Sequence, residues 1–240
     1  MTAGRIRAVF FDAAGTLFHV KGSVAEVYLR YAEKYGVART GELLEAVNEA
    51  FKRAFQDAPP PVFAVNDPIE IKRCERLWWF DIVHSVFYRV GMFERFDDFF
   101  DEVFEAFAGS EHWMLYPETL DVLKGLKGSG LELGVISNFD TRLFGILRGL
   151  GIADLIATVT IPSLAHAAKP AARIFRVALE QHALDPDEAI HVGNDLKEDL
   201  EGARAAGLTG VLLDRGRKHA ALSIPTIRCL DELPALLAKI

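Results

Sequence analysis

The sequence predicts an α/β fold, a doubly wound parallel sheet with an all-helical domain inserted after the first strand. Three observations predict it. The apolar run Ile6–Phe11 is typical of a buried strand, strand and helix patterns alternate after Pro117, and the stretch between them shows helical patterns alone. Alternating strands and helices form parallel sheets. We therefore expect residues 1–19 and 113–240 to form an α/β core domain and residues 20–112 a helical domain.

The inserted stretch is rich in aromatic residues and has no strand signal. Apolar positions at helical spacing predict helices over 23–36, 41–56, 67–91 and 94–108. Gly36 is a natural C-cap for the first of these helices. Pro59–Pro61 cannot be helical and mark a break after the second.

The second half of the chain alternates regularly between the two kinds of element. Its apolar runs predict strands over 131–137, 155–160, 189–192 and 210–213, and a last strand-helix pair from Thr226. Its periodic segments predict helices over 117–128, 140–150, 170–182 and 196–206. Together with the first strand, these segments make one sheet.

Composition limits the function classes. A formal net charge of −7 argues against a broad nucleic-acid-binding face, so we expect no nucleic-acid partner. Cys74 and Cys229 lie far apart without metal-ligand spacing, which indicates thiols in a reducing compartment. No segment approaches the about 18 apolar residues of a membrane span, and the N-terminal apolar run is too short for a signal peptide. We expect a cytoplasmic enzyme, monomer or homodimer, without a membrane partner.

Four polar sites lie at or beside the C-terminal ends of predicted strands. They are Asp12 with Thr16, Ser137 with Asn138, Lys169 before a helix, and the acidic segment 194–199 after the strand that ends at Gly193. Open α/β sheets bind their ligands at this edge. The sequence therefore predicts one site built from all four segments.

In this order and spacing, the four sites resemble the motifs of the haloacid dehalogenase superfamily of hydrolases. The helical insertion is similar to the family's cap domain, as in its helical-cap subfamily IA. The segments Asp12–Phe18 and Gly22–Val24 resemble the Reg-2-like members, which carry D-A-x-G-T-L-F and a following G-S-V. The resemblance implies a Rossmannoid core and a small anionic substrate that reacts through an aspartyl covalent intermediate.

The residue types fit that chemistry. A carboxylate at Asp12 can act as a nucleophile and divide one difficult step into two. Ser137, Asn138 and Thr16 offer polar groups to a phosphoryl group, and Lys169 supplies a positive charge for both Asp12 and the substrate. We expect Asp12, Thr16, Ser137 and Lys169 to be catalytic, and Ser137, Asn138 and Lys169 to bind substrate.

The acidic segment can hold a hard cation, which prefers oxygen ligands. The resemblance implies Mg²⁺, bound by Asp12, the backbone carbonyl of Ala14 and the fourth motif, for which the candidates are Asn194, Asp195 and Asp199. Mg²⁺ at this place would reduce the repulsion between nucleophile and phosphate. Asp199 has an alternative role, to orient Lys169. His191 lies on an apolar strand and is expected to be a core histidine.

The sequence departs from the phosphatase pattern at two positions. Phosphatases of the superfamily carry D-x-D-x-T, and the second acid protonates the leaving group and then activates water. Ala14 stands in its place here. Proton transfer of this kind contributes about 10²–10⁴ in rate. Asn194 stands where the family often has an aspartate. We therefore expect a substrate with a good leaving group, such as an acyl phosphate.

Three alternatives remain open. The first is a 2-haloacid dehalogenase, which expels halide without a proton and shares the Ser137-Asn138 pair. Against it, the tyrosine and the asparagine of that branch are replaced here by Phe175 and Leu196. Neither Arg30 nor Arg39 clearly matches its cap arginine. A phosphonoacetaldehyde hydrolase has D-x-A-G-T but needs a cap lysine, for which Lys52 is the candidate. The third alternative is a catalytically impaired binding protein on the same scaffold.

Overall fold

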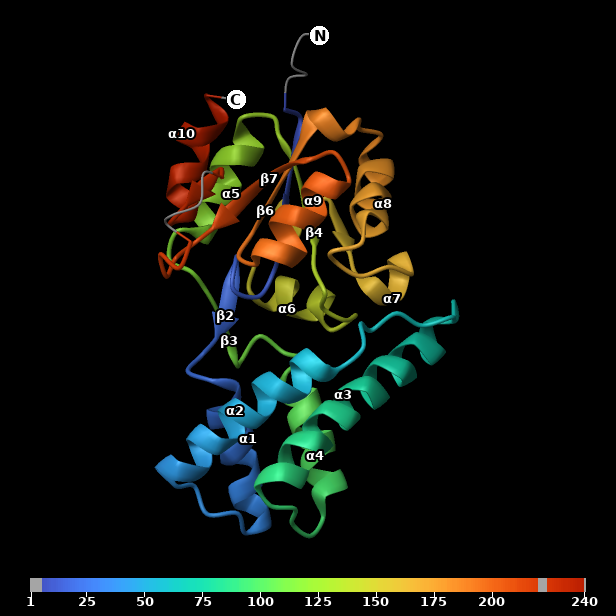
Figure 1. Cartoon of the computed structure of the whole chain (residues 1–240), viewed down its shortest axis with the longest axis vertical. Coiled ribbons are helices and arrows are strands. Elements are labelled where there is room, and N and C mark those ends of the chain that lie inside the picture. Colours follow the sequence, from blue (N-terminus) through green and yellow to red (C-terminus); the bar gives the residue numbers. More distant parts are fainter. Residues whose placement is uncertain (1–5, 220–223, 240) are drawn as a thin grey trace.

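The structure, a computed structural model, describes residues 6–219 and 224–239. Its main sheet has six parallel strands in the order β5-β4-β1-β6-β7-β8, and Figure 1 shows it flanked by helices. The strands are β1 (Ala8–Phe11), β4 (Glu132–Ile136), β5 (Thr158–Thr160), β6 (Ala189–Gly193), β7 (Thr209–Leu213) and β8 (Thr226–Ile227). The predicted fold class, a doubly wound α/β sheet, is confirmed.

The central strand β1 has helices on both of its faces. Successive side chains of a strand point to opposite faces, and all four residues of β1 are buried. Phe10 belongs to a core cluster with α8 (Ala172–His182) and α9 (Gly202–Ala205). Val9 and Phe11 belong to a second cluster with α5 (Thr119–Gly128), α6 (Leu143–Gly149) and α10 (Leu233–Leu237). An apolar run buried on both faces is what a central parallel strand requires.

Register brings three strand ends to the same edge. Phe11 pairs with Val135 of β4 on one side and with Val192 of β6 on the other. The residues that follow these strands, including Asp12 and Ser137, therefore lie side by side at the carboxyl edge of the sheet.

Residues 24–106 form four α-helices below the sheet in the view of Figure 1. They are α1 (Val24–Ala32), α2 (Gly41–Asp57), α3 (Pro68–Val90) and α4 (Phe96–Ala106). Three of these helices have side-chain N-caps, Ser23 for α1, Thr40 for α2 and Asp67 for α3, whose oxygens accept from backbone N–H groups of the first turn. Gly36 has φ 84° and ends the first helical segment as predicted.

A small second sheet joins the two parts of the molecule. Strands β2 (Phe18–Val20) and β3 (Trp113–Leu115) pair antiparallel. Strand β2 spans the boundary that we propose at 19/20, and β3 begins directly after the boundary that we propose at 112/113. The sequence pattern indicates neither of these strands, because three-residue strands leave too little periodicity to recognise.

Two shorter helical elements also differ from prediction. The structure has a helix, α7 (Pro162–Ala165), that the sequence pattern did not indicate. The predicted helix over 196–206 is two elements, a π-helical segment, η4 (Leu196–Glu201), followed by α9. π-Helical turns are frequent at functional sites, and this one follows β6 at the carboxyl edge of the sheet.

Helix α3 packs its first half against the α/β core. Glu75, which is 2% exposed, accepts hydrogen bonds from Thr141 N at 3.1 Å, Thr141 Oγ1 at 2.5 Å and Ser163 Oγ at 2.5 Å. Burial raises the pKa of Glu75, and these hydrogen bonds partly offset the shift. One turn further on, Trp79 Nε1 donates to Asp140 Oδ2 at 2.5 Å. These contacts hold the four-helix part over the loop that follows β4.

Two further predictions concern composition. Cys74 and Cys229 are free thiols, each half-buried. Among the described residues, no helix combines the length and the apolar character that crossing a bilayer needs.

Candidate active site

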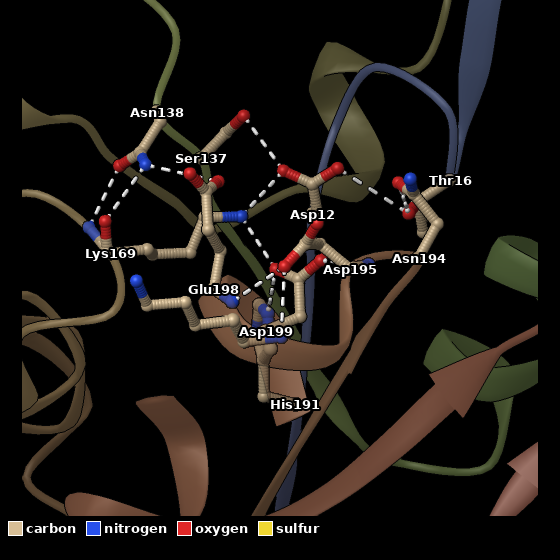
Figure 2. Close-up of polar contacts among 11 residues, drawn as sticks. Asp12, Thr16, Ser137, Asn138, Lys169, His191, Asn194, Asp195, Glu198 and Asp199 are labelled. Carbon is tan, nitrogen blue, oxygen red and sulfur yellow. Dashed lines mark hydrogen bonds and ion pairs between the residues drawn. The ribbon is translucent and has the colours of Figure 1, made fainter. Parts of the chain in front are cut away.

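Asp12 lies at the centre of the site, directly after β1, and is 7% exposed. Its Oδ1 accepts from Ser137 Oγ at 2.9 Å and from Lys169 Nζ at 2.7 Å (Figure 2). Its Oδ2 has one long contact, 3.4 Å to Thr16 Oγ1. One carboxylate oxygen is thus held in place by two donors, and the other has no close hydrogen bond among the described residues.

Lys169 is the only cation in direct contact with this carboxylate among residues 6–219 and 224–239. It is 4% exposed, and its Nζ donates to Asp12 Oδ1 and, at 2.6 Å, to Asp199 Oδ1. Burial lowers the pKa of Lys169, but the charges of the two carboxylates outweigh it and raise that pKa above its usual range. Lys169 therefore remains protonated, and a third N–H is left for a substrate oxygen.

The two carboxylates that share Lys169 respond differently to burial. Burial raises the pKa of Asp12, and the positive charge of Lys169 only partly offsets it. Burial also acts on Asp199, but Lys169 and a hydrogen bond from His191 prevail and hold the pKa of that carboxyl below its usual range. One cation between two buried acids leaves an excess negative charge at the nucleophile, which a bound cation would stabilise.

Asn138 fixes the lysine from behind. Its Oδ1 accepts from Lys169 N at 2.8 Å, and its Nδ2 donates to Lys169 O at 3.0 Å and to Glu198 Oε2 at 3.1 Å. The amide group of Asn138 is therefore occupied by the protein, as Figure 2 shows. This geometry favours a positioning role for Asn138 over direct substrate binding.

Both carboxylate oxygens of Asp199 are engaged by the protein. Oδ1 accepts from Lys169 Nζ and from His191 Nε2 at 2.9 Å, and Oδ2 accepts from Asp195 N at 2.9 Å. His191 is fully buried, as predicted for a core histidine, and packs edge-on against Phe175 with ring centroids 5.1 Å apart. The structure favours the alternative role of Asp199, which is to orient Lys169, over the metal role.

Thr16 and Asn194 meet on the open side of Asp12. Thr16 is fully buried, and its Oγ1 donates to Asn194 Oδ1 at 3.1 Å. Gly15 has φ 91°, and a Cβ added there would lie 2.7 Å from Asn194 Oδ1. Glycine is needed at this position both for the backbone angle and for the close approach of the asparagine.

The side chains around Asp12 Oδ2 offer oxygen to a cation. The Thr16 hydroxyl contacts both the Asn194 side-chain oxygen and Asp12 Oδ2, and so links these two residues. Asp195 Oδ1 caps the following helical turn, where it accepts from Lys197 N and Glu198 N. Across the described ranges, no three His, Cys, Asp or Glu side chains are grouped as a metal site. The two carboxylates of Asp12 and Asp195 and the amide oxygen of Asn194 are hard oxygen ligands. They fit Mg²⁺, with water filling its remaining coordination positions, better than a softer ion.

A cavity of about 850 Å³ opens above Asp12, between the sheet edge and the four helices. Its floor includes Asp12, Ser137, Lys169 and the exposed Ala14. Small-molecule sites have about this size. Ala14 leaves no proton-transfer group at the position two residues after the nucleophile.

Several residues of the alternative functions do not line this cavity. Lys52 is exposed and pairs with Glu49 at 2.6 Å, so it does not reach the site as a Schiff-base lysine would. Arg30 and Arg39 are exposed outside the cavity. Phe175 is fully buried in the core against His191.

Glu198 and Arg142 are two of the cavity residues that the sequence analysis did not single out. Glu198 holds Asn138 and lines the cavity, and burial raises the pKa of its carboxyl. Arg142 lines the cavity with its guanidinium bound to Asp140 through Nε at 2.9 Å and Nη2 at 2.6 Å. The sequence does not distinguish Glu198 from the neighbouring acids, and it does not distinguish Arg142 from any other arginine at the start of a helix.

Comparison with known proteins gives consistent results. Residues 6–207 match the family described as haloacid dehalogenase-like hydrolase. The haloacid dehalogenase-like hydrolase domain-containing protein 3 of Danio rerio is 33% identical over 240 residues, which cover 97% of this chain and 96% of that protein. The phosphoserine phosphatase of Thermus thermophilus is 34% identical over 141 residues, which cover 58% of this chain and 57% of that protein.

Solved structures that resemble the chain include phosphatases and dehalogenases of this superfamily. Another similar structure, described as a HAD-hydrolase, YfnB of Bacillus subtilis bound to magnesium, superposes with a TM-score of 0.75 at 17% identity, covering 98% of this chain and 99% of that one. This similarity concerns the fold.

Proposed function

The chain belongs to the haloacid dehalogenase-like hydrolases, and on this basis we propose that it transfers a phosphoryl group from a small anionic substrate to water through Asp12. The observation that carries the proposal is the buried contact of Asp12 with Ser137 and Lys169 on the floor of the cavity. The enzyme is a hydrolase of this superfamily with phosphatase relatives. The substrate and the covalent intermediate are our proposal.

The two carboxylate oxygens of Asp12 have different hydrogen-bond partners, and this difference indicates which of them attacks phosphorus. Oδ1 accepts from Ser137 and Lys169, whereas Oδ2 has only the 3.4 Å contact with Thr16. We assign Oδ2 as the nucleophile. The remaining N–H of Lys169 and the rotatable hydroxyl of Ser137 would hold phosphoryl oxygens in the transition state. Asn138 and Asp199 keep Lys169 in place.

The cation site that supports this chemistry is on the Oδ2 side. Asp12, Asn194, Asp195 and the carbonyl of Ala14 would hold Mg²⁺, while Asp199 stays with Lys169. When bound, Mg²⁺ would neutralise charge shared by the nucleophile and the phosphate. Two buried carboxylates, those of Asp12 and Asp199, share the single positive charge of Lys169, and this charge balance supports the placement.

Ala14 determines which leaving group is possible. Without an acid at this position, no side chain two residues from the nucleophile can protonate an alkoxide as it departs. We propose that the substrate instead releases an oxygen that is stable as an anion, as an acyl phosphate does. Efficient turnover of simple sugar phosphates would contradict this part of the proposal.

Ala14→Asp tests the proposal directly. We expect the variant to hydrolyse glycerol phosphate about 10²-fold faster than the wild type, because a positioned acid restores proton transfer to a poor leaving group. Acetyl phosphate, whose leaving group needs no proton, should gain less, because only the attack of water on the intermediate can benefit from the new acid. The measurement is phosphate release from both esters, with and without Mg²⁺.

Ala14→Asn is the matched control, since asparagine has the same shape but cannot transfer the proton. It should stay at the wild-type rate on glycerol phosphate. If wild type and Ala14→Asp both fail to hydrolyse acetyl phosphate, 4-nitrophenyl phosphate and glycerol phosphate with Mg²⁺, the phosphatase assignment is wrong.

A second candidate, 2-haloacid dehalogenation, is favoured by one observation, the Ser137-Asn138 pair beside a nucleophile without a second acid. The cavity opposes it, because its helical wall offers no unpaired cation for the carboxylate of a haloacid within the described ranges. Halide release from 2-chloropropionate, measured beside the phosphate assays, distinguishes the two activities.

A further inference from the structure

The wall of the cavity opposite Asp12 is aromatic and uncharged. The lining residues that come from the stretch 20–112 include no Asp, Glu, Lys or Arg side chain among those described. Rings dominate this wall: Phe51, Phe55, Trp78, Trp79, Phe100 and Phe104. A sugar or a second anionic group of a substrate would find few polar partners there.

Both indole N–H groups of this wall are already bound within the protein. Trp78 Nε1 donates to Pro59 O at 2.7 Å, and Trp79 Nε1 donates to Asp140. Both indoles therefore present ring carbons rather than N–H groups to the cavity.

The one arginine at the cavity is also neutralised. Arg142 forms a paired contact with Asp140 and lies over the rings of Trp79 and Phe104, at 5.1 and 4.1 Å from their centroids. Its side chain is 10% exposed. It supports the aromatic wall and has no free charge to offer an anionic ligand.

Phe55 is the accessible part of this wall. It stacks on Phe51 with centroids 5.8 Å apart and contacts Trp78 and Trp79 at 5.9 and 6.0 Å, yet 42% of its surface is exposed. An exposed ring in a cluster of rings is suited to stacking with another planar apolar group.

We infer that the substrate is an aryl phosphate, a phosphate monoester whose leaving group is the oxygen of an aromatic ring. This inference rests on the proposed phosphatase function and narrows its substrate class. Ala14 requires a leaving oxygen of low basicity, and a phenol has a pKa of about 10, as in tyrosine, against about 16 for water. The aromatic wall requires a planar apolar group attached to that oxygen. An aryl phosphate satisfies both.

The reaction balances without any further reagent. Asp12 Oδ2 forms a bond to phosphorus, and the bond between phosphorus and the aryl oxygen breaks with its electron pair on that oxygen, which leaves as a phenolate. Water then attacks phosphorus, Asp12 is released as the carboxylate, and both protons of the water leave on dihydrogen phosphate.

Four phosphate compounds separate leaving ability from ring binding. 1-Naphthyl phosphate has a ring and a phenolate leaving group, acetyl phosphate has a better leaving group and no ring, 2-naphthylmethyl phosphate has a ring and an alkoxide, and glycerol phosphate has neither. We expect kcat/KM for 1-naphthyl phosphate to exceed that for acetyl phosphate at least tenfold, although carboxylates, with a pKa near 4, leave more readily. 2-Naphthylmethyl phosphate should bind with a similar affinity and turn over about 10²-fold more slowly.

Phe55→Ala tests the wall itself. The ratio of kcat/KM for 1-naphthyl phosphate to that for acetyl phosphate should fall about threefold to tenfold, the scale of one aromatic contact. Tyr88→Ala is the matched control: Tyr88 is an aromatic residue of the same helical stretch, 78% exposed and outside the cavity lining. It should leave the ratio unchanged.

The outcomes separate the two proposals. If acetyl phosphate is hydrolysed with a kcat/KM equal to or above that of 1-naphthyl phosphate, the aryl inference is wrong and the phosphatase function stands. If no compound is hydrolysed, calorimetric titration of Asp12→Asn with 1-naphthyl phosphate and glycerol phosphate decides it: binding at least tenfold tighter for the naphthyl compound supports the aromatic site, and equal or absent binding overturns it.

Discussion

Asp12→Asn should lower kcat by at least about 10⁴-fold, since loss of a nucleophile costs about 10⁴–10⁶ in comparable hydrolases. Asparagine has the same shape, and its amide oxygen can still accept from Ser137 and Lys169. Substrate binding should therefore remain, so that activity is lost without loss of the site. The measurement is the turnover of acetyl phosphate together with a calorimetric Kd.

Folding stability should move in the opposite direction. Because burial raises the pKa of Asp12, its ionised form costs folding free energy at pH 7, and a neutral asparagine removes that cost. We expect Asp12→Asn to unfold at an equal or higher temperature than the wild type. Asp121→Asn, an exposed aspartate on α5, is the control and should change neither property. An Asp12→Asn variant that retains more than a tenth of wild-type turnover contradicts the assignment of the nucleophile.

Lys169→Met should affect both activity and stability. It removes the donor nearest the transferred group, which costs about 10²–10³ in kcat for comparable electrostatic groups. It also leaves Asp12 and Asp199 buried beside each other without a cation, and breaking a buried pair in this way costs about 3–5 kcal/mol of unfolding free energy. Urea unfolding and steady-state kinetics measure the two effects.

The stability loss has a defined pH dependence. In the wild type, the pKa of Asp199 is depressed, so its stabilising contribution is present above its unfolded value near 3.8 and is lost as the pH falls below it. Without Lys169 both carboxyls take up protons more readily, so the deficit of the variant should be largest at pH 7 and shrink toward pH 4. Lys197→Met, which removes an exposed lysine at the same cavity, should show neither the deficit nor its pH dependence. A deficit that is constant with pH would contradict the charge argument.

The sequence allowed the sheet and the location of the site to be predicted, because both depend on local patterns. The run Ile6–Phe11 is buried on both faces and ends at an acid, which identifies a central parallel strand and its carboxyl edge. The other site segments follow their own strands or precede a helix in the same way. Since the ends of parallel strands meet at one edge, their side chains meet there as well.

Elements that depend on tertiary contacts could not be predicted. The strands β2 and β3 have three residues each and are stable because they pair across the junction of the two parts. Helix α7 has four residues. Glu75 appears as one acid on a charged helix, and only the folded chain shows it buried against Thr141 and Ser163.

The roles within the site also needed geometry. The family resemblance implies substrate binding for Asn138 and metal binding for Asp199. In the structure, both side chains form hydrogen bonds with Lys169 instead. The aromatic character of 20–112 was visible in the sequence, where packing of the helical domain was the simplest explanation for it. The cavity shows that part of this aromatic surface faces the nucleophile.

The most direct test of the central proposal is to trap the intermediate. The enzyme is mixed with a slight excess of acetyl phosphate, quenched in acid within milliseconds, digested and analysed by mass spectrometry. We predict one phosphoryl group on the peptide that contains Asp12, at the Asp12 side chain, and none in the Asp12→Asn variant. Phosphate release by the wild type with no phosphorylated peptide at any quench time, or with the phosphoryl group on another residue, would contradict the account.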